Sequence, residues 1–226
     1  LLAIFSTLLL SACSEQVATP ISDASLDDYP VRPALDQLSQ ADAIGRKARV
    51  SNISYVLDID LVSLADSYQG SVTANFTLTD NDKPLNIDFT GGSVNGVVVN
   101  GEMLEPDYNG YFVTLSASAL VAGRNEVLIE YAHPFDQDGT GLHRFVDPED
   151  DRTYLYTYLW PYYSNRLFPN FDQPNLKATY ELTVRAAADW EVISSTTEDA
   201  ITRDGDTAVW HFPQSEKFSS YIFSLH

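Results

Sequence analysis

Basic residues are scarce in this sequence. Lys and Arg number 13 against 32 Asp and Glu, which gives a formal charge of −19 over 226 residues. A surface of that charge repels phosphate backbones, so the composition argues against nucleic-acid binding and tolerates cationic partners. Charge says nothing about the fold, but a hydrophobic content of 44% allows a substantial core.

Cysteine occurs once, as Cys13, so there is no disulfide framework. The apolar run before it is too short to span a membrane and is typical of a secretory signal. Its end, Leu10-Ser11-Ala12-Cys13, resembles the lipobox of bacterial lipoproteins. The resemblance implies an incomplete signal peptide over 1–12, a lipidated Cys13 and a flexible tether over 13–33. It also implies export and lipid anchoring to the bacterial cell envelope, and Ser14 after the Cys resembles the signal for sorting to the outer membrane. An incidental Cys in an ordinary signal peptide is the alternative.

Common catalytic motifs are missing as well. The four histidines include no pair at helical i, i+4 spacing, and H-E-x-x-H is absent. There is neither a G-x-S-x-G motif nor a glycine-rich phosphate loop. We therefore assign no catalytic residue and no metal ligand to this chain. The acidic stretch from Asp136 to Asp151 is interpreted as a solvated loop in preference to a calcium site, because the EF-hand spacing is lacking.

The body of the sequence predicts an all-β fold. Apolar residues alternate with polar ones in short segments bounded by turn residues, which is the pattern of half-buried strands. These segments are 55–61, 72–78, 85–89, 111–115, 127–131, 153–160, 178–184, 190–193, 208–212 and 220–225. Roughly ten or more strands at this spacing indicate a β-sandwich or barrel.

Two kinds of local signal supplement the strand pattern. Asn95-Gly96 and Asn100-Gly101 are strong hairpin signals, because both residue types accept positive φ. Pro33 suits the first turn of a helix, and Arg46 and Lys47 suit the last turn. We therefore predict one short N-terminal helix over Ala34–Ala48. The predicted strand 220–225 ends without a turn, so we expect the domain 34–226 to be incomplete at its C-terminal end.

The segment 153–160 carries an aromatic side chain at every second position. Tyr154, Tyr156, Tyr158 and Trp160 share one face of a strand because strand side chains alternate. The face is either part of the core, with a large aromatic payload, or the wall of a cleft that binds ligands by stacking or cation–π contact. On the pattern alone, the core interpretation is preferred.

Several blocks of the sequence resemble the N-terminal domain of aminopeptidase N-like zinc peptidases. The most specific block is Phe-Pro-x-Phe-Asp-Gln-Pro at 168–174, and it is supported by 49–58, 139–144, 154–157, 190–194 and 218–223. The resemblance implies a saddle-shaped β-sandwich that packs against a catalytic domain of the same chain. That domain would hold the zinc and follow this one in sequence, and its G-A-M-E-N and H-E-x-x-H motifs are absent here. Peptides would be the substrates of the parent enzyme, and this chain alone would be inactive.

The resemblance also points to a substrate-binding pair in this domain. After Tyr-x-Tyr-Thr, the family usually has Gln, an apolar residue and Glu, and this Glu helps bind the α-amine of the substrate. Here Tyr158 and Trp160 occupy those two positions. We therefore expect either an aromatic face that receives the ammonium group or a reshaped pocket. The alternative to the enzyme hypothesis is a free-standing, lipid-anchored β-sandwich module that binds peptide or carbohydrate.

Overall fold

The computed structural model describes residues 32–62 and 66–226. The expected signal peptide, Cys13 and the expected tether up to residue 31 lie outside the described residues. Within the described part, no helix is long and apolar enough to cross a membrane.

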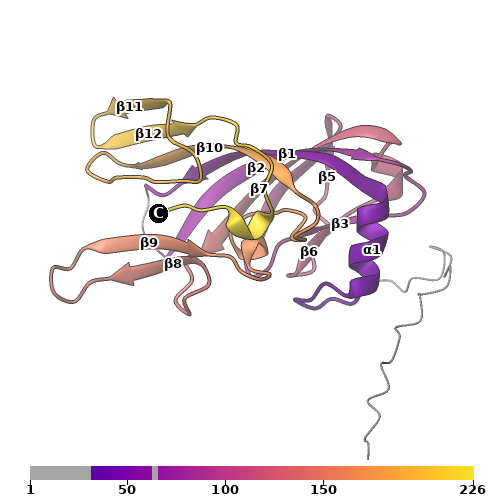
Figure 1. The fold of residues 1–226 in the computed structure, drawn as a ribbon, viewed down its shortest axis with the longest axis horizontal. Helices are drawn as coiled ribbons and strands as arrows, with labels where there is room; N and C mark the ends of the chain where they lie inside the picture. Colours follow the sequence, from indigo (N-terminus) through magenta and orange to yellow (C-terminus); the bar gives the residue numbers. More distant parts are fainter. Residues whose placement is uncertain (1–31, 63–65) are drawn as a thin grey trace, which may run out of the picture. The chain divides into compact units, whose positions relative to one another are not determined.

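The described residues form twelve strands, which confirms the predicted all-β fold (Figure 1). Eight of them make one mixed sheet in the order β11-β12-β10-β1-β2-β7-β4-β5, and β3–β6 and β8–β9 are two-stranded sheets. Their bounds are β1 Val50–Asp60, β2 Ser67–Leu78, β3 Leu85–Asp88, β4 Ser93–Val99, β5 Glu102–Leu104, β6 Phe112–Leu115, β7 Gly123–Pro134, β8 Gly141–Val146, β9 Thr153–Tyr158, β10 Ala178–Ala187, β11 Ala200–Asp204 and β12 Thr207–Phe212.

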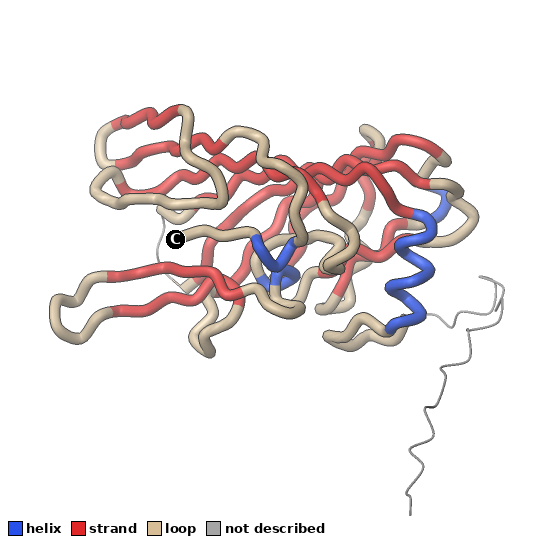
Figure 2. The backbone as a smooth tube through the Cα atoms, viewed as in Figure 1, coloured by secondary structure: helices blue, strands red, loops and turns tan. Residues whose placement is uncertain are grey.

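One face of the large sheet carries the core. Both small sheets lie on the same side of the large sheet, and together they form the second layer of the sandwich (Figures 1 and 2). Ring contacts join the layers: Tyr55 of β1 lies 5.8 Å from Phe168, and Phe76 of β2 lies 5.2 Å from Phe171. The Phe-Pro-x-Phe-Asp-Gln-Pro block therefore supplies core residues that cover the middle of the sheet.

The helix is shorter than predicted and begins later. Helix α1 spans Gln40–Arg49, with Ser39 as the N-cap whose hydroxyl accepts a hydrogen bond from the Asp42 N–H. The preceding residues do not continue it, because Asp36 accepts hydrogen bonds from Thr90 and Asn165 of the second layer. The prediction of a helix over Ala34–Ala48 missed both the capping role of Ser39 and the tertiary contacts of Asp36.

Two predicted strands are wrong. Residues 220–225 form a 3-10 helix, Ser220–Ile222, followed by a single bridge between Leu225 and Ser194. The Ser220 hydroxyl donates to Asp172, a buried contact that a strand pattern cannot reveal. Residues 190–193 are not a strand either, since the Trp190 N–H closes a turn onto the Ala187 carbonyl. Strands β4, β5, β8 and β11 were not among the predicted strand segments, although the Asn-Gly signals indicated a hairpin at β4–β5. Strand β8 lies within the expected acidic loop 136–151.

The two Asn-Gly pairs differ in structure. Asn100 and Gly101 have φ of 53° and 86° and form the turn of the β4–β5 hairpin, as predicted. Asn95-Gly96 lies inside β4, where the pairing with β7 shifts register between Val94 and Gly96. The Asn95-Gly96 pair thus lies at a β-bulge, a feature to which the same residue types are suited.

Candidate functional site

The β8–β9 hairpin exposes a row of large aromatic side chains. Tyr154, Tyr156 and Tyr158 are 47%, 38% and 46% exposed, and Trp160, just beyond the strand, is 58% exposed. The intervening Leu155 and Leu159 are buried instead. The preference for a core interpretation of this row is therefore wrong: the leucines face the core, and the aromatic residues face outward.

Strand pairing places further side chains on the outward face. Directly opposite residues of an antiparallel pair share a face, and Phe145 pairs with Tyr154, His143 with Tyr156 and Gly141 with Tyr158. The His143 and Tyr156 rings lie 4.9 Å apart, and Phe145 is exposed. We call the exposed set of Phe145, Tyr154, Tyr156, Tyr158 and Trp160 the aromatic face.

The other face of the hairpin holds it to the domain. Leu142 and Leu155 are buried on that side. Thr157 is fixed to the C-terminal segment twice: its N–H donates to the Leu225 carbonyl, and its hydroxyl accepts from the Leu225 N–H at 3.0 Å. The aromatic face is thus presented by a hairpin that is anchored along its back.

Trp160 lies on a turn that is anchored on both sides. Leu159 is buried, and its carbonyl accepts a hydrogen bond from the Tyr163 N–H at 3.0 Å. The Tyr162 hydroxyl accepts a hydrogen bond from the Arg32 guanidinium at 2.9 Å. These contacts fix the backbone on either side of Trp160 while its indole remains exposed.

A cluster of carboxylates surrounds Arg166 next to the inner end of the aromatic face. Its guanidinium lies 3.1 Å from Asp138, 3.8 Å from Asp136 and 3.9 Å from Asp36. The site therefore holds three carboxylates against one arginine. A side chain on Gly141 would meet the Asp136 carboxylate, so this carboxylate covers the strand beside Tyr158 on the aromatic face.

The carboxyl groups of the cluster titrate differently. Burial raises the pKa of Asp136 to about 7, with Asp138 adding to the shift and Arg166 opposing it. Hydrogen bonds from Thr140, together with Arg166, lower the pKa of Asp138 to about 2. Near neutral pH, Asp138 is charged and Asp136 is close to its midpoint.

A second charge cluster is buried beneath the turn that carries Trp160. The Asp88 carboxylate pairs with Arg32 and, at 2.6 Å, with Arg46 of α1, and it also accepts from the Asp172 N–H. Asp88 is fully buried. Burial, reinforced by Asp88, raises the pKa of Asp172 to about 6. Sequence reasoning missed this cluster, although Asp172 lies in the distinctive 168–174 block and Arg46 was noted as a helix-end cation.

The structure gathers no metal-binding set within residues 32–62 and 66–226. His133 is buried between the carbonyls of Thr90 and Pro134, and burial lowers its pKa. His211 lies at the surface beside Asp199 and Glu181. In the acidic stretch 136–151, Asp136 and Asp138 contact Arg166, and Asp147 lies in the hairpin turn.

Fold and site define a β-sandwich domain whose exposed aromatic hairpin is its candidate recognition surface. The Peptidase M1 N-terminal domain family matches residues 51–222, and the chain belongs to this family. Aminopeptidase N of Streptomyces lividans is 32% identical over 190 residues, which are 83% of this chain and 22% of the relative. A probable aminopeptidase 1 of Sulfurisphaera tokodaii is 32% identical over 81 residues, covering 36% of this chain and 10% of the relative.

A solved structure supports the same fold. A variant M1 zinc metallopeptidase from Deinococcus radiodurans superposes with a TM-score of 0.66 at 16% identity, over 78% of this chain and 42% of that one. The same protein has also been solved with a Tyr-Ser-Ala substrate bound. The present chain therefore spans about a fifth of the Streptomyces relative and less than half of the solved protein.

Proposed function

We propose that this chain is the non-catalytic N-terminal domain of a zinc aminopeptidase, and that the aromatic face forms a wall of its peptide-binding cleft. The observation that carries the proposal is the outward orientation of Tyr158 and Trp160 on an anchored hairpin and turn. Family membership and the aminopeptidase relatives support the parent activity, which is removal of N-terminal residues from peptides.

Zinc has no fitting site among the residues described. Those residues contain no group of three or more His, Cys, Asp or Glu that could hold a metal. In this proposal the zinc belongs to a catalytic domain of the full-length protein, which is the partner of the domain described here. We derive no catalytic step for the present residues, whose role is to shape the cleft and bind peptide.

Trp160 and Tyr158 would receive the ammonium group of the substrate. The resemblance places a carboxylate where Trp160 stands, and an exposed indole can attract a cation through its π face. The fixed turn supports this role, because a pre-positioned ring loses little conformational entropy on binding.

A Trp160→Ala exchange in the full-length enzyme tests the pocket role. We expect KM for aminoacyl substrates to rise about tenfold with kcat little changed, since the lost contact binds substrate and transition state alike. Met103→Ala, at an 81% exposed apolar site on β5, is the matched control and should leave both constants unchanged. Unchanged kinetics in the Trp160 variant would remove the pocket role.

The aromatic face also favours the second candidate, a free-standing module that binds peptide or carbohydrate. The gene sequence beyond the codon for His226 separates the two. A reading frame that continues through H-E-x-x-H supports the enzyme, and a stop codon near that position supports the module.

The lipid anchor at Cys13 remains part of the proposal, on the strength of the Leu10–Cys13 pattern. Anchoring would place the domain at the membrane of the bacterial cell envelope. Cells fed a labelled fatty acid should label the protein, and Cys13→Ser should abolish the label.

A further inference from the structure

The aromatic face extends well beyond Trp160. Phe145 and Tyr154, which pair with each other, continue it to the outer end of the hairpin, beyond the His143–Tyr156 and Gly141–Tyr158 pairs. We infer that this face binds an extended peptide that carries arginine or lysine side chains. The inference rests on the proposed function and names the class of peptide that the cleft takes.

The spacing of the tyrosines matches an extended peptide. Tyr154, Tyr156 and Tyr158 are alternate residues of β9, so neighbouring Cα atoms on this face are about 6.6 Å apart. An extended ligand repeats its side chains on one side with the same period. Alternate residues of the ligand can therefore each lie against one ring.

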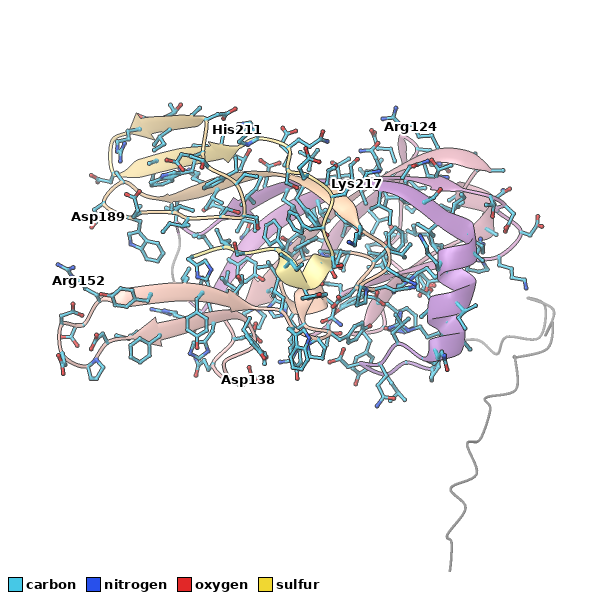
Figure 3. The ribbon with its side chains drawn as sticks, in the orientation of Figure 1. Arg124, Asp138, Arg152, Asp189, His211 and Lys217 are labelled. Atoms are coloured by element: carbon cyan, nitrogen blue, oxygen red, sulfur yellow. The ribbon has the colours of Figure 1, made fainter. Side chains whose placement is uncertain are left out.

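The charges around the face select a cation. Residues 136–160 contain six acidic residues and two arginines, which sum to 2 − 6 = −4, and no lysine. The acidic groups lie at both ends: Asp136 and Asp138 at the inner end, and the turn Asp147–Arg152 at the outer end (Figure 3). Arg152 lies 3.5 Å from Asp150 within that turn.

Aromatic rings between carboxylates are suited to guanidinium and ammonium groups. The ring π face attracts the cation, and arginine in addition stacks flat on aromatic rings. A row of exposed aromatic side chains is typical of an interaction site. An anionic membrane or an acidic peptide would meet repulsion at both ends of the face.

A second copy of the chain does not fit as the occupant. Two aromatic faces brought together would each carry the local charge of −4, on chains whose formal charge is −19. Like charges facing each other oppose association. The partner that complements the face is therefore a basic peptide.

Binding of two isosteric peptides to the full-length protein tests the inference. Both are acetylated and amidated, which removes the terminal charges, and both are labelled at one end. One has arginine at alternate positions separated by serine, and the other has citrulline in place of every arginine. We expect the arginine peptide to bind about tenfold more tightly, with a preference that weakens as salt is added.

Variants locate the site. Tyr156→Leu keeps an apolar side chain but removes the ring, and it should lower the affinity for the arginine peptide about threefold to tenfold. Met103→Ala on β5 is the control and should bind as the wild type does. Thermal melting of each variant verifies that the fold is retained.

The outcomes separate the inference from the proposed function. Equal binding of the two peptides, with sensitivity to Tyr156→Leu, overturns the basic-peptide inference and leaves the peptide-binding wall intact. Binding of neither peptide overturns both. A concentration-dependent dimer in sedimentation that Tyr156→Leu dissolves also overturns the inference, because it makes a second copy the occupant.

Discussion

The Asp136 carboxylate stands in the space that a side chain on Gly141 would occupy. Gly141 has φ of 62° and lies directly opposite Tyr158 across the β8–β9 ladder. The Leu142 N–H donates to the same carboxylate at 3.2 Å, which holds it over the strand. A glycine at this position thus lets an anionic group lie beside the aromatic face.

Replacing Gly141 with alanine should expel this carboxylate. The variant is destabilised both by left-handed backbone strain and by the steric conflict with Asp136. We therefore expect a loss of roughly 2–3 kcal/mol in the free energy of unfolding. Gly139→Ala is the matched control: its φ of 86° imposes the strain, but no atom lies within 4 Å of the added methyl group. Urea unfolding should show about 1 kcal/mol for that control. Equal losses in the two variants would contradict the contact.

The raised pKa of Asp136 predicts a pH-dependent stability. Burial raises this pKa to about 7, above the ordinary value of about 3.9 in the unfolded chain. The folded state therefore binds the proton more tightly, so this contribution to stability is complete below pH about 4 and is lost as the pH rises to about 7. Asp136→Asn should flatten the profile of unfolding free energy between these limits.

The control for this prediction is Asp138→Asn. Hydrogen bonds from Thr140 lower the pKa of Asp138 to about 2, so its contribution is present above pH about 4 and is lost toward pH 2. That variant should keep most of the slope between pH 5 and 8, moved to somewhat lower pH because Asp138 contributes to the raised pKa of Asp136. The pKa of Asp172 is also raised, to about 6, so Asp172 changes the stability with pH in the same direction as Asp136. Because Asp172 is present in both variants, its contribution cancels when their pH profiles are subtracted.

The strands of the large sheet could be predicted because their burial alternates. In β10, every second residue from Ala178 to Ala186 is buried, and the polar residues between them face solvent. The same rule failed at 220–225, where alternating residues form a 3-10 helix. There a hydrogen bond between Ser220 and Asp172, far apart in sequence, decides the local structure.

The candidate site was predictable in its residues but not in its orientation. A spacing of two showed that Tyr154, Tyr156 and Tyr158 share a face, and it did not show which face of the hairpin meets the core. Leu142 and Leu155 decide that, because they pack inward from both strands. The carboxylates around Arg166 come from segments up to 130 residues away, which pattern reasoning does not bring together.

Removing the shared carboxylate of the buried charge cluster should be strongly destabilising. Asp88→Ala leaves the guanidinium groups of Arg32 and Arg46 buried without their counter-ion, so we expect a loss of roughly 3–5 kcal/mol. Asp60→Ala removes a single 3.2 Å ion pair with Arg185 and a hydrogen bond from the Val62 N–H, at the surface where both charged side chains are about half exposed. Exposed pairs contribute ~0–1 kcal/mol. Denaturant unfolding of both variants measures the difference, and losses of similar size would contradict the burial of the cluster.

The exposure of Trp160 can be read from intrinsic fluorescence. The chain has three tryptophans, of which Trp210 is fully buried, Trp190 is half-buried and Trp160 is 58% exposed. Trp160→Phe should therefore shift the emission to shorter wavelength and reduce quenching by acrylamide, while stability changes by less than about 0.5 kcal/mol because the site is on the surface. Trp210→Phe should shift the emission to longer wavelength and increase the fraction quenched by acrylamide, and it should lower the stability of the core. If quenching of the Trp160 variant matched that of the wild type, the indole would be covered in the folded protein, and Trp160 could not be part of the aromatic face.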